Sequence, residues 1–196
     1  METLKALSPD AKIYTFINKM DLLEELNKIN NLTEIKTYLE SSEINNLNLI
    51  FLPTSIWDIS IYKAWSNIFS EFIPQLDKVK ELLKKFVIAC WADEAVLLDK
   101  NTLIKICAYN DKEFQDNERF EKMTEIIKRF KYSCKINSTV FKDIMIKTVN
   151  NIIYIDEFEN STYIIVSFRN NKSTLELIKI NIELCKKSFG ELFDNE

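Results

Sequence analysis

A four-residue motif, Asn18-Lys19-Met20-Asp21, has the residue types and the spacing of a loop that reads guanine. An ionised Asp21 can accept two parallel hydrogen bonds from the ring N–H and the exocyclic amine of guanine, which adenine cannot donate in that arrangement. Each charge-assisted hydrogen bond contributes about 1.5–3 kcal/mol. The apolar stem of Lys19 can lie along the purine face, and the Asn18 amide can fix the loop. The motif therefore predicts a site that distinguishes guanine from adenine.

Two apolar segments are placed to position such a site. Residues 13–17 predict a buried strand that ends at the motif, and the carboxyl ends of strands are where open α/β sheets bind ligands. A second predicted strand, residues 47–52, is followed by Thr54-Ser55-Ile56-Trp57-Asp58. The second motif therefore also follows a short predicted strand.

Several segments together carry a resemblance to a known family. They are Ser8-Pro9-Asp10-Ala11-Lys12-Ile13, the two loop motifs, Tyr62-Lys63-Ala64-Trp65-Ser66, and residues 119–134. They resemble Rag GTPases, the A/B type in particular, from about residue 4 to about residue 192. The earlier segments resemble the last third of that family's GTPase domain, and residues 119–134 resemble its C-terminal domain.

The resemblance implies which residues bind the nucleotide base. In the family, the Lys and Asp of the first motif contact guanine, and the Ser-Ile of the second motif closes the other side of the base. Carried onto this chain, the predicted GTP- or GDP-binding residues are Asn18, Lys19, Asp21, Ser55 and Ile56. Many A/B-type Rag proteins have His where this chain has Asn18. Asn is the commoner residue there among Ras-like GTPases, so the interpretation as a guanine site stands.

The phosphate-binding parts of a Ras-like fold are not expected in this sequence. They comprise a glycine-rich loop, its Lys and Ser/Thr, a magnesium-binding threonine and a DxxG segment. The chain contains one glycine, Gly190, near its C-terminus. We expect a Rag protein without its N-terminal catalytic half, with magnesium bound only by a complete form. We therefore predict that this chain has no catalytic residue and no metal site. It should not hydrolyse GTP and should bind nucleotide only weakly. Whether the protein is an enzyme stays open.

Composition narrows the remaining classes of function. The net charge of -4 gives no basic field that would favour nucleic acid. No apolar run reaches the ~20 residues of a membrane span, and the N-terminus lacks a signal-peptide pattern, which is typical of a soluble intracellular protein. The chain has no histidine, so every Ser/His or Cys/His catalytic pair is absent. Four widely separated cysteines are expected to be small buried hydrophobes and not zinc ligands: Cys90, Cys107, Cys134 and Cys185.

The first part of the chain, residues 1–73, predicts alternating helices and strands. A helix ending near residue 7, the two strands and helices at 22–38 and 58–72 correspond to the last strands and helices of a Ras-like G domain. Pro74 marks the predicted boundary, because proline favours the first turn of a new helix. The predicted fold class is α/β, with this partial Ras-like G domain followed by a second domain at residues 74–196.

The second part predicts helix, two strands, helix, three strands and helix. Apolar residues recur at helical spacing over 76–86 and 120–134, and we expect Phe120, Ile127 and Phe130 to be buried against the sheet. The predicted strands are 95–98, 102–109, 140–146, 152–158 and 163–168, with a turn at 99–101. Residues from 173 onward favour a helix, although their apolar residues partly alternate as in a strand. This order is that of the roadblock, or longin-like, domain, an α/β domain with a five-stranded antiparallel sheet, which the Rag resemblance also implies.

Three functions are compatible with these features. The resemblance implies a Rag-type small GTPase that pairs with a C/D-type Rag GTPase through the roadblock domain and relays amino-acid sufficiency to the target-of-rapamycin kinase complex. A membrane-anchored roadblock scaffold would recruit this cytoplasmic protein to the lysosomal or vacuolar surface, without direct membrane insertion. The alternative is a non-catalytic roadblock dimerisation scaffold that has lost nucleotide hydrolysis. A third is an unrelated structural protein with a coincidental motif, in which Asp21→Ala would change no interaction.

Overall fold

The computed structural model describes residues 7–8, 10–40, 48–73, 75–110, 119–159, 161–169 and 173–193. Contacts divide the chain into two compact units, Met1–Trp65 and Ser66–Glu196. Pro74 lies outside the described residues, and the domains 1–73 and 74–196 stay predictions. The predicted N-terminal helix also lies outside them, except for Leu7, which is helical.

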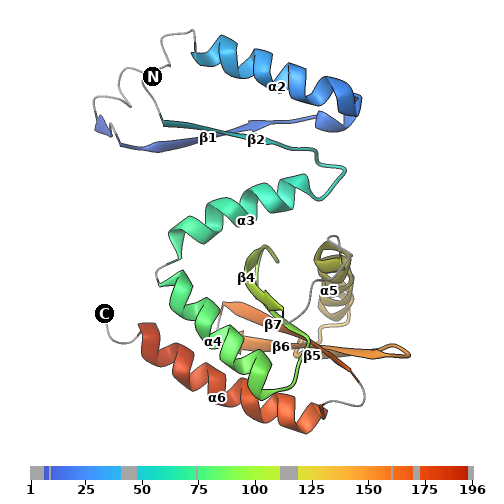
Figure 1. The fold of residues 1–196 in the computed structure, drawn as a ribbon. Coiled ribbons are helices and arrows are strands. Elements are labelled where there is room, and N and C mark those ends of the chain that lie inside the picture. Colours follow the sequence, from blue (N-terminus) through green and yellow to red (C-terminus); the bar gives the residue numbers. More distant parts are fainter. Residues whose placement is uncertain are drawn as a thin grey trace. The chain divides into compact units, whose positions relative to one another are not determined.

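The first unit contains a strand–helix–strand arrangement. Strands β1 (Lys12–Ile17) and β2 (Asn48–Pro53) are parallel, with Lys12 opposite Asn48 and Ile17 opposite Pro53. A short 3-10 helix, η1 (Met20–Leu22), precedes helix α2 (Glu25–Glu40), which lies along the two strands (Figure 1). Parallel strands need such a crossover helix. Because the strands are in register, both end at the same edge of the sheet.

Helix α3 (Ser60–Phe72) follows the loop after β2. It begins two residues later than predicted, because the Asp58 carboxylate accepts the backbone N–H of Ser60 at 2.8 Å and so caps the helix start. The ring of Phe16 in β1 packs on Trp65 of α3, with ring centroids 5.1 Å apart. Helix α3 is thus capped at its start and packed against β1.

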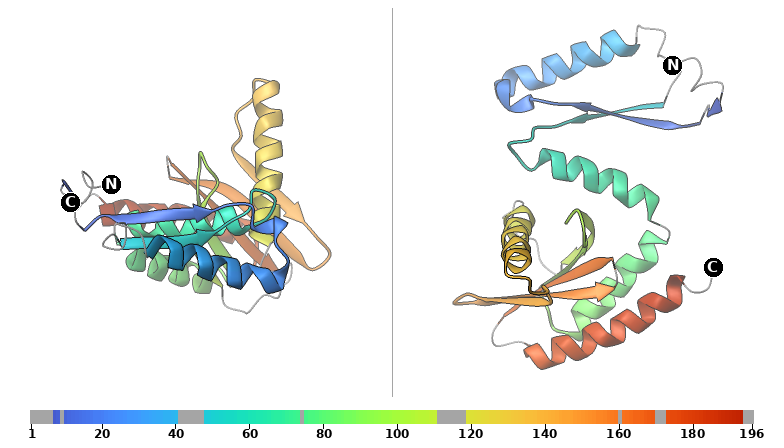
Figure 2. Two further views of the ribbon diagram at one scale, coloured as in Figure 1. Left: turned by 90° about the horizontal axis from the view of Figure 1, so that it is seen from above. Right: turned by 180° about the vertical axis from the view of Figure 1, so that it is seen from behind.

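The second unit is a five-stranded antiparallel sheet in the order β4-β3-β7-β6-β5. Helices α4 (Leu76–Ala89) and α6 (Leu175–Phe193) cover one face, and α5 (Arg119–Ile136) covers the other (Figures 1 and 2). The predicted fold class is confirmed, including the helix at the C-terminus. The strands are β3 (Glu94–Asp99), β4 (Lys105–Asn110), β5 (Asp143–Lys147), β6 (Asn151–Glu159) and β7 (Thr162–Arg169).

Side-chain alternation along the central strands builds two apolar cores. Leu97 and Val166 pack with α4 and α6, whereas their neighbours Leu98 and Ile165 pack with α5. Successive residues of a strand point to opposite faces, so a strand covered on both faces must be apolar throughout. This explains why β3 and β7 have continuous apolar sequences.

Two strand starts differ from the prediction because loops hold the preceding residues. Asp99 accepts the backbone N–H groups of Asn101 and Thr102 at 3.1 and 2.7 Å, so β4 begins at residue 105 and not at 102. Before β5, the Thr139 N–H donates to the Cys134 carbonyl at 2.9 Å, which ties this segment to the end of α5. Strand β5 therefore begins at residue 143 and not at 140.

Helix α5 buries less of its apolar face than predicted. Ile127 is fully buried against the sheet, but Phe130 is 48% exposed and Ile126 is 44% exposed. Phe130 reaches only the edge of the Phe141 ring, with centroids 6.1 Å apart, because it lies beside the covered face and not over it. The side chain of Phe120 lies outside the described residues.

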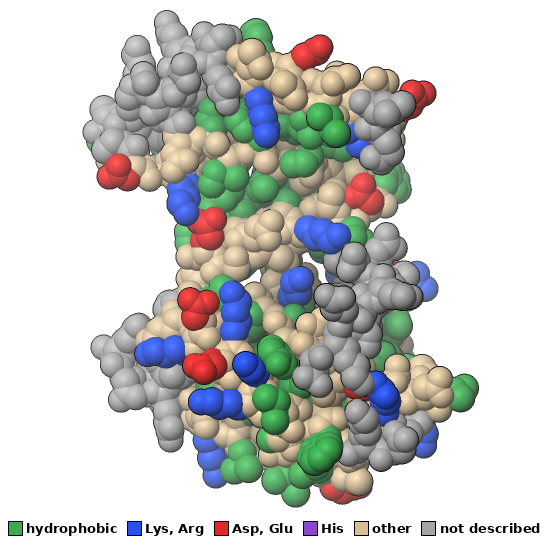
Figure 3. Space-filling model, viewed as in Figure 1, with side chains coloured by type: hydrophobic (Ala, Val, Ile, Leu, Met, Phe, Trp, Pro, Cys, Tyr) green, Lys and Arg blue, Asp and Glu red, His purple; other side chains and the backbone are tan. Residues whose placement is uncertain are grey.

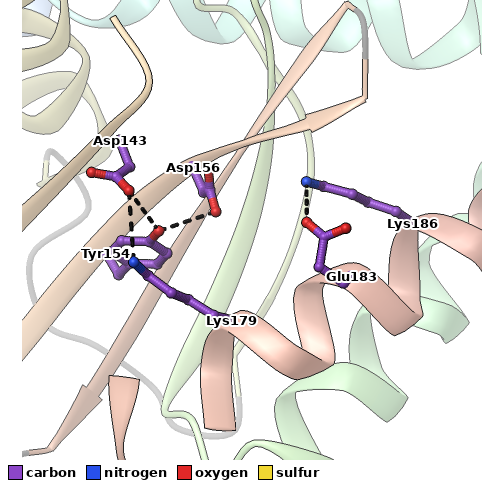
Figure 4. A network of polar contacts seen from close by, with 6 residues as sticks. All are labelled: Asp143, Tyr154, Asp156, Lys179, Glu183 and Lys186. Atoms are coloured by element: carbon purple, nitrogen blue, oxygen red, sulfur yellow. Dashed lines mark hydrogen bonds and ion pairs between the residues drawn. The ribbon is translucent and has the colours of Figure 1, made fainter. Parts of the chain in front are cut away.

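A polar cluster fastens α6 to the sheet (Figure 4). The hydroxyl of buried Tyr154 in β6 lies 3.1 Å from carboxylate oxygens of both Asp143 and Asp156. Lys179 of α6 places its Nζ 3.8 Å from Asp143 and 5.3 Å from the centroid of the Tyr154 ring. Burial first, and then the Asp156 carboxylate, raise the pKa of the Tyr154 hydroxyl. The hydroxyl stays protonated and donates to one carboxylate at a time.

Candidate functional site

The two polar loops meet at the carboxyl edge of β1 and β2. The Thr54 N–H donates to the Ile17 carbonyl at 2.8 Å, and the Met20 N–H donates to the Thr54 carbonyl at 3.2 Å. The Thr54 hydroxyl donates to the Asn18 amide oxygen at 2.6 Å. Thr54 is fully buried, so its own groups in these three bonds are shielded from water. They hold the first loop against the second.

Asp21 and Ser55 are joined directly. The Ser55 hydroxyl donates to Asp21 Oδ1 at 2.5 Å, and the same oxygen of Ser55 accepts the Trp57 N–H at 3.1 Å. Ser55 is fully buried, whereas Asp21 is exposed. An ionised carboxylate offers about four lone-pair positions, so one hydroxyl leaves room for two further donors. The arrangement orients the carboxylate and keeps it open to a ligand with two parallel N–H groups.

A second set of bonds fastens Ser55 to the start of α3. The Ser55 N–H donates to the Ser60 hydroxyl oxygen at 2.7 Å, and that hydroxyl donates to Asp58. The Ser60 hydroxyl is the main cause that holds the pKa of Asp58 below its usual value of 3.8; slight burial opposes it, and Lys28 and Lys63 assist it. Ser55 is therefore positioned by its hydroxyl and by its backbone.

Lys19 adopts a left-handed backbone conformation, with φ 66° and ψ 31°. This conformation is unfavourable for a residue with a Cβ atom, and such residues cluster at functional sites. The turn sends the Met20 side chain into the interior, where it is 7% exposed, and leaves Lys19 and Asp21 at the surface. The bond from Met20 to Thr54 stabilises the turn.

The predicted site residues are thus brought together to different degrees. Asn18, Asp21 and Ser55 take part in the bonds between the two loops, whereas Lys19 and Ile56 lie exposed on those loops. Ile56 is 72% exposed beside the equally open Trp57. Two exposed apolar side chains next to an oriented carboxylate suit contact with a flat ring that carries polar edges.

Two residues that position the site were not predicted from the sequence. Thr54 joins the loops and Ser60 holds Ser55. A signal for Ser60 was present, because Asp58 and Ser60 immediately precede a helical apolar pattern and so form a capping sequence. Thr54 offered only its place in the loop motif that follows the second predicted strand.

Metal-ligand groups and thiols are the other candidates for chemistry among the described residues. No group of three or more Cys, Asp and Glu side chains among the described residues is placed to hold a metal ion. Burial raises the pKa of the Cys107 thiol to about 12 and that of Cys185 to about 11. Neither thiol is a reactive thiolate near neutral pH. Within the same described residues, no helix combines the length and apolarity needed to cross a bilayer.

Known proteins match this chain over most of its length. The model of the Gtr1/RagA G protein conserved region matches residues 1–127. The chain is 36% identical over 205 residues to the GTP-binding protein GTR1 of Saccharomyces cerevisiae and 33% identical over 192 residues to the Ras-related GTP-binding protein B of Rattus norvegicus. These alignments cover 96% and 98% of this chain, but 65% and 51% of the relatives.

Two further matches concern a different relative and the fold. The Ras-related GTP-binding protein C of Homo sapiens is 30% identical over 125 residues, which cover 62% of this chain and 31% of that protein. MglB of Myxococcus xanthus superposes with a TM-score of 0.54 at 14% identity, covering 63% of this chain and 92% of MglB. At that identity the superposition shows a shared fold alone.

Proposed function

The chain belongs to the Gtr1/RagA family of G proteins, and from this premise we propose that it supplies the base-reading and dimerisation parts of a Rag-type small GTPase. Asp21 accepts two hydrogen bonds from the guanine of GTP or GDP, while Lys19 and Ile56 cover the faces of the base. The observation that carries this proposal is the 2.5 Å hydrogen bond from Ser55 to Asp21 across the two loops. It orients a solvent-facing carboxylate at the carboxyl edge of a parallel sheet, where α/β folds bind nucleotides.

Nucleotide binding by this chain alone is expected to be weak. Most of the charge of GTP lies on its phosphates, which glycine-rich loops and helix N-termini complement. Gly190 is the single glycine in the sequence, and it lies in α6 of the other unit. Base contacts remain, and they are sufficient for a test at millimolar nucleotide concentrations.

Saturation-transfer NMR with GDP, xanthosine diphosphate (XDP) and ADP tests the proposed guanine site. The unmodified chain should transfer saturation to GDP and far less to ADP. Asp21→Asn turns one acceptor into a donor that faces the donors of guanine, which should weaken GDP about tenfold or more and favour XDP, whose carbonyl accepts. Asp10→Asn is the matched control, because Asp10 precedes the opposite end of β1. A preference for guanine over xanthine that survives in Asp21→Asn would overturn the assignment.

The second unit is proposed to pair with a C/D-type Rag GTPase. Among the described strands, β5 pairs with β6 alone, so it forms one edge of the sheet. Met145 on β5 is 52% exposed, and Ile126 and Phe130 on α5 are half-exposed. An open strand edge beside an apolar helix face suits the addition of a second sheet. Ras-related GTP-binding protein C is itself similar to this chain, which supports a pairing between two related proteins.

Two matched isoleucine substitutions test this pairing. Ile126 of α5 and Ile180 of α6 are both exposed, on helices that cover opposite faces of the sheet. Co-purification with a C/D-type partner should fall at least tenfold for Ile126→Lys, because burying an unpaired charge opposes association, and should be unchanged for Ile180→Lys. Equal retention of the partner by both variants would contradict the proposed surface.

In cells, the heterodimer is proposed to relay amino-acid sufficiency to the target-of-rapamycin kinase complex. A membrane-anchored roadblock scaffold would hold this cytoplasmic protein at the lysosomal or vacuolar surface. Family membership and the MglB-like fold support this role. Tagged protein should lose its position on that membrane when the scaffold is depleted; retention there would contradict recruitment through the scaffold.

A non-catalytic roadblock scaffold is the second candidate, favoured by the well-buried cores of the second unit. Such a scaffold would bind its partner equally with and without nucleotide. The intact mass of the endogenous protein discriminates between the candidates. A mass of 23.1 kDa supports the scaffold, whereas a larger protein with a glycine-rich loop supports the GTPase.

A further inference from the structure

A cavity of about 600 Å³ lies in the second unit; we call it the α5 pocket. It is bounded by the last turns of α5, the turn after β3 and the segment before β5. Its floor contains Leu103, Phe141 and Tyr163, all of them buried, while Tyr132 and Val140 are exposed at its rim. Tyr132 and Val140 therefore offer apolar surface around a recess with an apolar floor, which one large side chain can enter.

The charges around the α5 pocket are opposite in sign to the charge of the chain. Among the described residues, four lysines line it, against the single carboxylate of Glu157: Lys100, Lys128, Lys131 and Lys135. The whole chain carries a net charge of -4. Burial, and then the neighbouring charge of Lys100, lower the pKa of Lys131. The α5 pocket is thus lined mainly by positive side chains, although the chain as a whole carries a negative net charge.

The two inner lysines are held by protein groups. Lys100 Nζ lies 2.6 Å from a carboxylate oxygen of Glu157, and Lys131 Nζ donates to the Lys100 carbonyl at 2.7 Å. Both ammonium groups also lie near the face of Tyr163, at 5.7 and 5.2 Å from its ring centroid. They strengthen the positive field over the floor, but they do not form an open pair of donors that would grip a single phosphate.

The two outer lysines are spaced along the helix. Lys128 and Lys135 are seven residues apart on α5. This spacing places them on one side of the helix, with their Cα atoms about 10.5 Å apart along the helix axis. Separated charges of this kind match carboxylates on either side of an apolar residue in an extended chain. A flat membrane would contact the two lysines without reaching the recessed floor.

We propose that the α5 pocket binds an acidic peptide segment of a partner protein, with one aromatic or large aliphatic side chain on the floor and flanking carboxylates near Lys128 and Lys135. Complementary charges raise the rate of association and orient the peptide. The buried apolar side chain supplies the anchor. This inference is independent of guanine binding, because every lining residue belongs to the second unit.

Fluorescence anisotropy with the complete chain tests the proposal. The probe is a fluorescein-labelled twelve-residue peptide with one central Phe and Asp or Glu residues on both sides. Lys128→Glu with Lys135→Glu should weaken binding at least tenfold. The matched control is Lys78→Glu with Lys84→Glu, which makes the same change of charge at exposed positions of α4 and should stay within twofold. Replacing the central Phe of the probe by Gly should weaken binding about tenfold.

The outcomes that would overturn the proposal are distinct. An affinity weaker than about 1 mM for the unmodified chain would exclude the peptide site, and equal weakening by both lysine pairs would show attraction by overall charge alone. Binding to phosphatidylserine vesicles without binding to the peptide would assign the lysines to a membrane surface. Lys135→Glu alone should weaken binding at least threefold with an unchanged melting temperature, which separates binding from folding.

Cys134 provides a readout of location, because it lines the α5 pocket. Bound peptide should slow its alkylation by iodoacetamide several-fold in the complete chain. Cys107, buried in the core on the opposite face of the sheet, is the internal control and should react slowly with or without peptide. Anisotropy binding without protection of Cys134 would place the peptide elsewhere and overturn the assignment.

Discussion

The two units of the chain differ in how completely their strands are buried. Every residue of β1 and β2 is half-buried or exposed, whereas five of the six residues of β3 are buried. The second unit has an apolar core on each face of its sheet. The candidate guanine site lies on the less covered unit, where hydrogen bonds between loops hold Asp21 and Ser55 together. In the first unit, specific hydrogen bonds between loops are therefore combined with strands that bury little of their surface.

This difference indicates where the chain needs a ligand or further protein. Hydrophobic side chains reach the surface of the first unit over its two strands (Figure 3). Two strands with one helix bury little apolar surface, and a pair of strands is marginal by itself. The second unit meets the usual conditions for independent stability, namely a larger sheet covered on both faces. We expect the first unit to gain order when its exposed edges are covered.

The largest expected effect follows from separating the units. A fragment of residues 74–196 should unfold cooperatively as a well-behaved species, because it keeps both apolar cores. The complete chain should aggregate more readily through the strands and apolar faces of residues 1–73. Light scattering combined with urea unfolding checks both statements. A complete chain that unfolds cooperatively as a stable monomer would contradict the claim that the first unit is the less stable of the two.

Two matched phenylalanine substitutions sharpen the comparison. Phe168 of β7 is fully buried, whereas Phe16 of β1 is half-buried against Trp65. Phe168→Ala should lower the free energy of unfolding of the second unit by about 3–5 kcal/mol, as for other core phenylalanines. Phe16→Ala should cost the first unit about 1–2 kcal/mol, since less surface is lost. Urea titrations followed by circular dichroism and tryptophan fluorescence measure both; equal losses would contradict the difference in burial.

Alkaline pH should destabilise the second unit through Cys107. Its pKa is about 12 in the folded chain against 9.0 for an ordinary thiol, because burial disfavours the thiolate. A raised folded pKa means that stability is complete below pH 9 and is lost as the pH rises towards 12. At pH 10 the loss is about 1.4 kcal/mol. Urea unfolding of Cys107→Ala should show a smaller fall between pH 8 and 10 than the parent, with Cys134→Ala as control; identical falls would refute the assignment.

The smallest expected effect concerns the capping contacts of the first unit. Asp58 has a lowered pKa, mainly because it accepts the Ser60 hydroxyl. Its contribution to stability is therefore present above the ordinary value of 3.8 and is lost as the pH falls through the lower folded pKa. Carboxyl-carbon NMR titration should give Asp58 a pKa below 3.8, and Ser60→Ala should move it upward. An Asp58 that titrates identically in the two proteins would show that Ser60 does not set its pKa.

Sequence patterns predicted the second unit well because its strands and helices have clear periodicity. The apolar runs at 152–158 and 163–168 correspond to β6 and β7, which are buried on both faces. Strand starts were less accurate, since Asp99 and the segment after α5 make local bonds that periodicity does not reveal. Phe130 was wrongly expected to be buried. Helical spacing shows which residues share a face of the helix, but not how much of that face the sheet covers.

The sequence predicted the residues proposed to bind the base, but not all of the contacts that position them. Asp21 and Ser55 follow two predicted strands, so their meeting at one edge could be inferred from parallel pairing. The contribution of Thr54 could not, because a buried threonine that joins two loops has no distinctive sequence pattern. The left-handed Lys19 likewise has no signal, since such turns usually use glycine or asparagine.

Hydrogen exchange of the complete chain, measured by mass spectrometry with GDP or ADP at millimolar concentration, tests the central claim most directly. Without nucleotide, amides of β1 and β2 should exchange faster than those of β3 and β7, since local stability follows burial. GDP should slow exchange at residues 18–21 and 54–57, ADP should not, and the second unit should be unchanged. Equal baseline protection of the two sheets, or no specific response to GDP, would contradict the account of a guanine site on a sparsely covered unit.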